Sequence, residues 1–138
     1  MPNESNIAKF IAAYLTTALW SSTDESRDDG GDLIDQNYGV SDISPGSLAA
    51  MSGDCRNFLT EIGGVIESAI ETGKVICGSD FDEWERAGHD FWLTRNGHGA
   101  GFWDGDWPEP FAARLTDAAE SAGEVNLYIG DDGRVYQY

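Results

Sequence analysis

The sequence AGHDFWLTRNGHGAGFWDGD, at residues 87–106, carries the most information about the fold. It holds both histidines of the chain, His89 and His98, among tryptophans, aspartates and glycines. Asn-Gly between two apolar runs is a strong signal for a tight β-hairpin. The stretch therefore predicts strands at residues 90–95 and 100–104, joined by the Asn-Gly-His-Gly turn.

Alternation of side chains along these two strands predicts which residues share a face. His89 would lie on the same face as Asp104, and opposite it in the tighter of two registers. Asp90, Trp92 and Trp103 would lie on the other face. Because both faces carry large apolar groups, we expect helices to cover one face and a loop or a partner to cover the other.

The N-terminal half predicts two helices. Apolar residues recur at helical spacing over residues 5–20, and Ser5 is available as the N-cap. A second helix is predicted to begin at the Ser-Pro pair of residues 44–45. The Gly-Gly pair at 63–64 is expected to break or kink it, and Gly73 to end it.

The C-terminal part predicts further short elements. A short helix is expected at residues 80–86 and another at 109–122. Strands at 125–130 and 134–138 flank an Asp-Asp-Gly turn. This order predicts one α+β domain spanning residues 1–138, in which N-terminal helices pack on a small antiparallel sheet made of two C-terminal hairpins with a helix between them.

Charge restricts the classes of partner. The 138 residues include 25 Asp and Glu against 8 Lys and Arg, a formal net charge of −17. Such a surface repels nucleic acid and anionic membranes, so neither is expected to bind directly. It attracts basic protein surfaces, including those that bind nucleic acid. Surplus carboxylates that only keep the protein soluble remain the alternative.

The expected compartment is the cytoplasm. Residues 1–5 lack a basic segment, and the apolar run at 7–20 is interrupted by Lys9, so neither a secretory signal nor a spanning helix is predicted. Cys55 and Cys77 are too few for a disulfide scaffold. Both are expected to be reduced, partly buried thiols.

Two segments are predicted to bind a partner. Residues 21–44 predict a long acidic loop anchored by Leu33 and Ile34, with carboxylates that could imitate a row of phosphates. The second segment is a predicted patch of exposed tryptophans rimmed by carboxylates, which suits a basic protein. The candidate residues are Asp24, Glu25, Asp28, Asp29, Asp32 and Asp35 in the first segment, and Trp103, Asp104, Asp106, Trp107 and Glu109 in the second.

A metal site is the chemical alternative for residues 87–106. Histidine with carboxylates binds divalent ions, which makes His89, His98, Asp104 and Asp106 the candidate ligands. The spacing matches no His-x-x-x-His, Glu-x-x-His or calcium-loop pattern. We therefore predict no catalytic residue, bound metal or cofactor. In the structural alternative, the aromatic residues fill the core and the glycines serve turns.

Several motifs resemble those of a family of small proteins associated with tailed bacteriophages, prophages and mobile elements. The matching segments are residues 19–23, residues 35–38, the helix with Cys55, AGHDFWLTRNGHGAGFWD at 87–104 and LYIGDDGRVY at 127–136. The resemblance covers nearly the whole chain and implies expression inside a bacterial host. It carries no activity and no catalytic residues. The chain departs from the family pattern by a longer segment at residues 63–74.

Charge and resemblance together give the leading hypothesis. The protein is expected to bind and to inhibit or modulate a host nucleic-acid-binding protein or defence complex, through carboxylates that imitate DNA. One alternative is a metal-dependent hydrolase or nuclease that uses His89, His98, Asp104 and Asp106. Another is an accessory or structural phage protein without mimicry.

Overall fold

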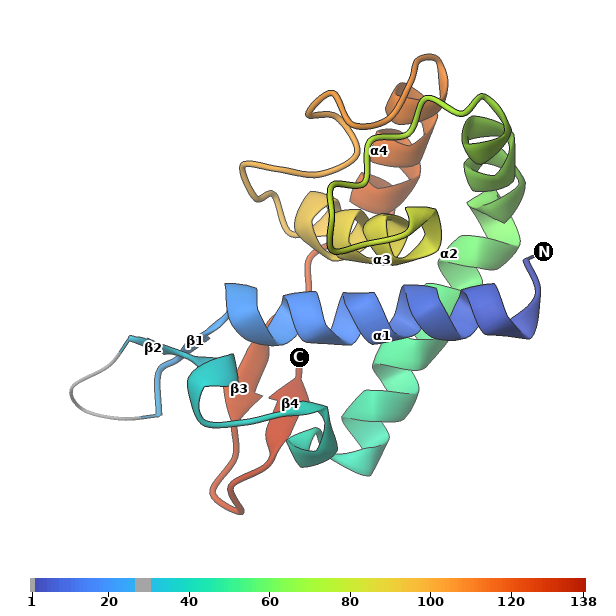
Figure 1. Cartoon of the computed structure of the whole chain (residues 1–138). Coiled ribbons are helices and arrows are strands. Elements are labelled where there is room, and N and C mark those ends of the chain that lie inside the picture. Colours follow the sequence, from blue (N-terminus) through green and yellow to red (C-terminus); the bar gives the residue numbers. More distant parts are fainter. Residues whose placement is uncertain (1, 27–30) are drawn as a thin grey trace.

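The computed structural model describes residues 2–26 and 31–138, and these residues form an α+β fold, as predicted (Figure 1). The α-helices are α1 (Glu4–Ser21), α2 (Pro45–Glu71), α3 (Glu83–Arg95) and α4 (Phe111–Ser121). Short 3-10 helices, η1 (Ile34–Gln36) and η2 (Val40–Asp42), lead into α2. The strands form two antiparallel pairs, β1 (Thr23–Asp24) with β2 (Asp32–Leu33), and β3 (Leu127–Ile129) with β4 (Val135–Gln137).

Helix α1 matches the predicted amphipathic helix, but its N-cap is not Ser5. The Asn3 side chain accepts a hydrogen bond from the Asn6 backbone N–H at 2.8 Å, and Ser5 already lies inside the helix. An asparagine side chain satisfies an otherwise unpaired donor of the first turn as well as serine does.

Helix α2 begins as predicted and continues further than predicted. Ser44 caps it by accepting from the Ser47 N–H at 3.2 Å, and Pro45 follows in the first turn. The expected break at the Gly-Gly pair is wrong, because the helix runs unbroken to Glu71. Gly63 instead allows a close contact, since a Cβ atom there would lie 3.0 Å from Cδ of Pro2.

The predicted hairpin at residues 90–104 is wrong, and with it the predicted faces and the pairing of His89 with Asp104. Residues 83–95 form α3, which a capping box between Asp82 and Glu85 begins. The predicted short helix at 80–86 is the start of this longer one. Asn96 ends the helix and Gly97 follows with φ of +70°, the left-handed conformation common after helix ends.

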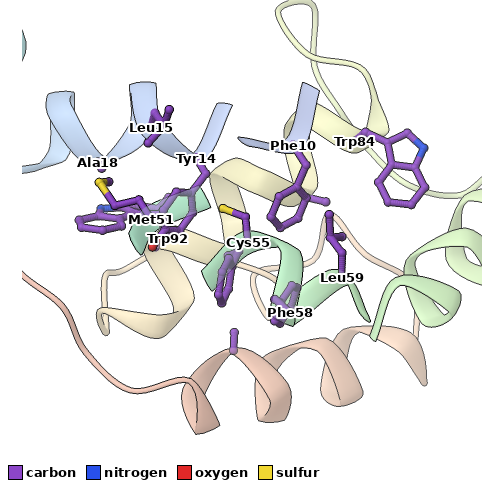
Figure 2. Close-up of a cluster of buried hydrophobic side chains, with 14 of the residues drawn as sticks. Phe10, Tyr14, Leu15, Ala18, Met51, Cys55, Phe58, Leu59, Trp84 and Trp92 are labelled. Carbon is purple, nitrogen blue, oxygen red and sulfur yellow. The ribbon is translucent and has the colours of Figure 1, made fainter. Parts of the chain in front are cut away.

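Helix α3 packs against α1 at very short range. A Cβ atom at Gly88 would lie only 2.1 Å from the carbonyl oxygen of Phe10. Aromatic rings fill the space around this crossing. Phe91 of α3 stacks on Phe58 of α2 with 4.0 Å between centroids, and Phe10 and Tyr14 of α1 flank Phe91. Figure 2 shows Phe10, Tyr14 and Phe58 within this buried cluster.

The predicted C-terminal hairpin is confirmed as the β3–β4 pair. The outer edge of β4 lies against the start of α2: the Ser44 N–H donates to the Val135 carbonyl at 2.8 Å, and the Gln137 N–H donates to Ser47 Oγ at 3.0 Å. These contacts fix the hairpin to the helices. None of the described helices is long and apolar enough to cross a membrane.

Candidate functional site

The loop at residues 96–110 connects α3 to α4 and projects one aromatic side chain outward. Phe102 is fully buried and Trp107 is 3% exposed, whereas Trp103 is 52% exposed. The exposure predicted for Trp103 is therefore confirmed and that predicted for Trp107 is wrong. Two buried anchors on either side hold Trp103 at the surface.

The last turn of α3 fixes the first anchor of this loop. Thr94 Oγ1 accepts a hydrogen bond from the Phe102 N–H at 3.0 Å. The chain approaches so closely that a Cβ atom at Gly101 would lie 2.2 Å from the same hydroxyl. The Gly101 N–H in turn donates to the Asp104 carboxylate at 3.3 Å. The position of Trp103 is thus set by the helix and not by the loop alone.

A buried carboxylate fixes the second anchor. Asp90 is 0% exposed and accepts from Trp107 Nε1 at 2.7 Å. Its Oδ1 lies 2.8 Å from His89 Nδ1, and its Oδ2, which accepts from Trp107, also lies 3.5 Å from Arg86 Nε. Arg86 also forms an ion pair with Asp106. A buried charge needs such partners, so this network holds the loop against α3.

Three predicted carboxylates of this loop differ in their surroundings. Asp106 is half-buried beside Arg86, while Asp104 and Glu109 are exposed. Glu109 accepts from the Ala113 N–H at 2.9 Å in the first turn of α4. Although Asp104 is exposed as a residue, the loop desolvates its carboxyl in part, which raises its pKa above the ordinary value. The Gly101 N–H lowers this pKa, and the neighbouring Asp106 carboxylate raises it further.

The candidate metal ligands are not gathered into a metal site. His89 packs its ring against Phe81 and Trp20, with centroids 5.1 and 5.9 Å away, whereas His98 is exposed beyond the end of α3. Within residues 2–26 and 31–138, no three His, Cys, Asp or Glu side chains are arranged to hold a metal ion. The structure therefore ties His89 to aromatic packing and to Asp90.

The described residues of the predicted acidic loop include β1, β2, η1 and η2. Ile34 is buried as the expected anchor, but Leu33 is exposed. Asp24 is 1% exposed and accepts from the Ser26 N–H and hydroxyl, so its prediction as a partner-facing carboxylate is wrong. The other predicted residues of this segment are Glu25, Asp32 and Asp35, which are exposed, and Asp28 and Asp29, which lie outside the described residues.

A polar groove of about 480 Å³ lies between the end of α1, the end of α3 and β3. It brings Glu25 of the acidic loop and the candidate residue His98 to one surface. Sequence reasoning missed this groove, because its walls come from segments far apart in the chain. The only local signal was the C-terminal hairpin, which predicts a strand edge but not what faces it.

Most described cationic side chains are paired within the molecule. Lys9 lies 2.8 Å from Asp82, Arg56 lies 3.2 Å from Glu4, and Arg86 pairs with Asp90 and Asp106. Arg95 is buried and lies 3.0 Å from Asp54. These four positive charges are thus compensated locally by carboxylates of the chain.

Comparison with known proteins assigns no family. No protein-family model, curated protein or solved structure matches the chain. The resemblance to small phage proteins therefore stays a prediction.

Proposed function

We propose that this protein binds a basic surface of a nucleic-acid-binding protein or defence complex of a bacterial host and inhibits or modulates it by competing with nucleic acid. The observation that carries the proposal is an exposed tryptophan, Trp103, held on an ordered loop of a protein with a net charge of −17. The resemblance to phage proteins supplies the bacterial setting.

Trp103 has the properties of a binding anchor. Tryptophan is enriched among residues that dominate binding energy in protein interfaces. The anchors before and after it, Phe102 and Trp107, are buried and hydrogen-bonded, so little conformational freedom of the loop is left to lose on binding. Asp104 next to it and Glu109 on the same loop provide negative charge for a basic rim.

The charge distribution supports a basic partner over an enzyme substrate. Four cationic side chains already form ion pairs with carboxylates of the chain, namely Lys9, Arg56, Arg86 and Arg95. They therefore compensate little of the negative field of the other carboxylates. Such a field accelerates encounter with a basic surface and disfavours acidic competitors. Mimicry of nucleic acid is the simplest use of that field against a nucleic-acid-binding protein.

Capture from a nuclease-treated bacterial lysate tests the proposal. Immobilised protein should retain a basic, nucleic-acid-binding protein at low salt and release it as salt rises, because screening weakens charge pairing. Duplex DNA added to the column should displace the same protein. A purified partner should in turn lose DNA binding when the acidic protein is added.

Matched variants locate the surface. Trp103→Ala combined with Asp104→Asn should abolish capture, whereas Ile76→Ala combined with Asp80→Asn should not. The control pair also removes one exposed apolar side chain and one exposed carboxylate. The proposal would be contradicted if the captured protein stayed bound at high salt, if duplex DNA did not displace it, or if the Trp103→Ala and Asp104→Asn variant still captured it.

A further inference from the structure

The outer edge of β3 carries backbone groups without a partner among the described residues. Asn126 exchanges two hydrogen bonds with Tyr138, and Gly130 bonds to Arg134 across the hairpin. In an antiparallel pair the residues between such positions point their N–H and C=O groups the other way. Leu127 and Ile129 therefore direct theirs away from β4, and both residues line the polar groove.

One backbone group of this edge already has a side chain of the same protein as its hydrogen-bond partner. The Val125 N–H, next in the same outward row, donates to the Asn96 side-chain oxygen at 2.9 Å. Asn96 also lines the groove and its amide nitrogen donates to the Trp92 carbonyl at 3.0 Å. A fixed side chain thus occupies the first position of the row, and the positions at Leu127 and Ile129 follow it.

A second strand edge also contributes to the lining of the groove. Ser22 accepts from the Ile34 N–H, so the next residue, Thr23, points its backbone groups away from β2. Thr23 lines the groove, and its strand β1 follows the end of α1 in Figure 1. The other edge of β4, by contrast, is covered by the start of α2 through Ser44 and Ser47.

We propose that the groove binds an extended, basic peptide segment, which adds as a strand to β3. Strand addition supplies affinity through backbone hydrogen bonds and specificity through alternate side chains. The inference rests on the proposed function for the basic character of the partner, and it adds the mode and the place of recognition.

The lining of the groove fits basic side chains. The lining includes the carboxylates of Glu25 and Glu124. Among the described residues, it includes no lysine or arginine. Tyr128 and Tyr138 also line it; their ring centroids are 5.3 Å apart, and the residues are 45% and 69% exposed. Exposed tyrosine faces attract Lys and Arg through cation–π contacts. An extended segment with alternating cations would meet both the carboxylates and the rings.

A defined peptide tests this inference directly. The probe is acetyl-KTKVKTK-amide, compared with the acidic peptide acetyl-ETEVETE-amide and with two basic peptides that are N-methylated at alternate residues. Hydrogen exchange followed by NMR should show new protection at the Leu127 and Ile129 amides when the basic peptide is bound. The Tyr128 amide, which already faces β4, is the internal control.

The peptides separate backbone pairing from simple charge attraction. The acidic peptide should not bind. One of the two N-methylated peptides should lose about tenfold in affinity, because it loses two backbone hydrogen bonds. Equal binding of all three basic peptides, or exchange protection elsewhere than along β3, would overturn the inference.

Protein variants provide a second test with a matched control. Glu25→Gln with Glu124→Gln should weaken the basic peptide severalfold at low salt, as expected for charges that face it. Glu61→Gln with Glu71→Gln makes the same change in net charge on α2, and should leave affinity within about twofold, because neither residue lines the groove and salt screens exposed charges that do not contact the peptide. Equal effects of the two pairs would contradict a groove site.

The two proposals fail in different ways. If the Trp103 and Asp104 changes abolish capture of a basic lysate protein but KTKVKTK leaves β3 unprotected, the proposed function stands and the strand-addition inference is wrong. If KTKVKTK protects β3 while no basic protein is captured, the groove is a peptide site and the proposed function is wrong.

Discussion

Replacing Gly88 by alanine should destabilise the protein, although alanine is the better helix former. Gly88 lies inside α3 at the crossing with α1. Its added Cβ would lie 2.1 Å from the Phe10 carbonyl oxygen and 3.1 Å from the Phe10 Cα. These are backbone atoms that cannot rotate away, so the two helices must move apart.

The expected net loss is about 2 kcal/mol of unfolding free energy. Overpacking a well-filled core costs about 1–3 kcal/mol, and a clash with backbone places Gly88→Ala near the top of that range. Better helix propensity returns about 1 kcal/mol. Separation of the helices would also disturb the contact between Phe10 and Phe91, whose centroids are 5.9 Å apart.

Urea unfolding followed by circular dichroism and tryptophan fluorescence measures this change. Gly64→Ala in α2 is the matched control, because no atom lies within 4 Å of its added Cβ. That variant should gain about 0.5–1 kcal/mol from helix propensity. If Gly88→Ala is as stable as the parent, or if both variants are stabilised alike, the tight packing of α1 on α3 is refuted.

Three further predictions concern buried or partly buried polar groups. Arg95→Met should cost about 3 kcal/mol in urea unfolding, because it leaves the carbonyl groups at the end of α4 and the Asp54 carboxylate without their partner. The Asp104 carboxyl has a raised pKa in the folded protein, so the folded parent loses stability relative to the unfolded chain as this group ionises above about pH 4. Asp104→Asn does not ionise and should therefore become more stable relative to the parent as pH rises. A constant difference in unfolding free energy across a pH series would contradict this. Iodoacetamide should modify Cys77 and leave Cys55 intact in the folded protein, as mass spectrometry would show, because Cys77 is partly exposed and Cys55 is fully buried; burial raises the pKa of both thiols, and that of Cys55 well above its ordinary value.

Elements with a local signal could be predicted from the sequence. The apolar spacing of α1, the Ser-Pro start of α2 and the Asp-Gly turn of the C-terminal hairpin each act within a few residues. Helix α4 was predicted at 109–122 and forms at Phe111–Ser121, after Pro110. In these cases local propensity and tertiary packing favour the same structure.

Helix α3 was mispredicted because its surroundings remove the usual amphipathic pattern. Residues 90–95 are all buried, so no polar face marks a helical period. Aromatic residues and threonine in such a run are also typical of strands. Gly97 with positive φ suits both a hairpin turn and a helix end, so the Asn-Gly pair does not distinguish them. The capping box at Asp82 and Glu85 was the local signal for the helix.

The candidate surface could be predicted only in part. Trp103 and the exposed carboxylates follow from composition, but the burial of Trp107 depends on Asp90, seventeen residues earlier. The burial of Asp24 likewise accompanies its hydrogen bonds to Ser26, which a charge count does not reveal. The groove depends on the meeting of α1, α3 and β3, for which the chain has no local pattern.

The last turn of α3 positions both candidate surfaces. Thr94 holds Phe102 and so sets the place of Trp103, while Asn96 holds Val125 and so sets the free edge of β3. Both contacts start from the same rigid helix, two residues apart. A partner that bound Trp103 and placed an extended basic segment in the groove would find the two sites in a fixed relation. Its second contact would then form at high effective concentration, without a further ordering cost to this protein.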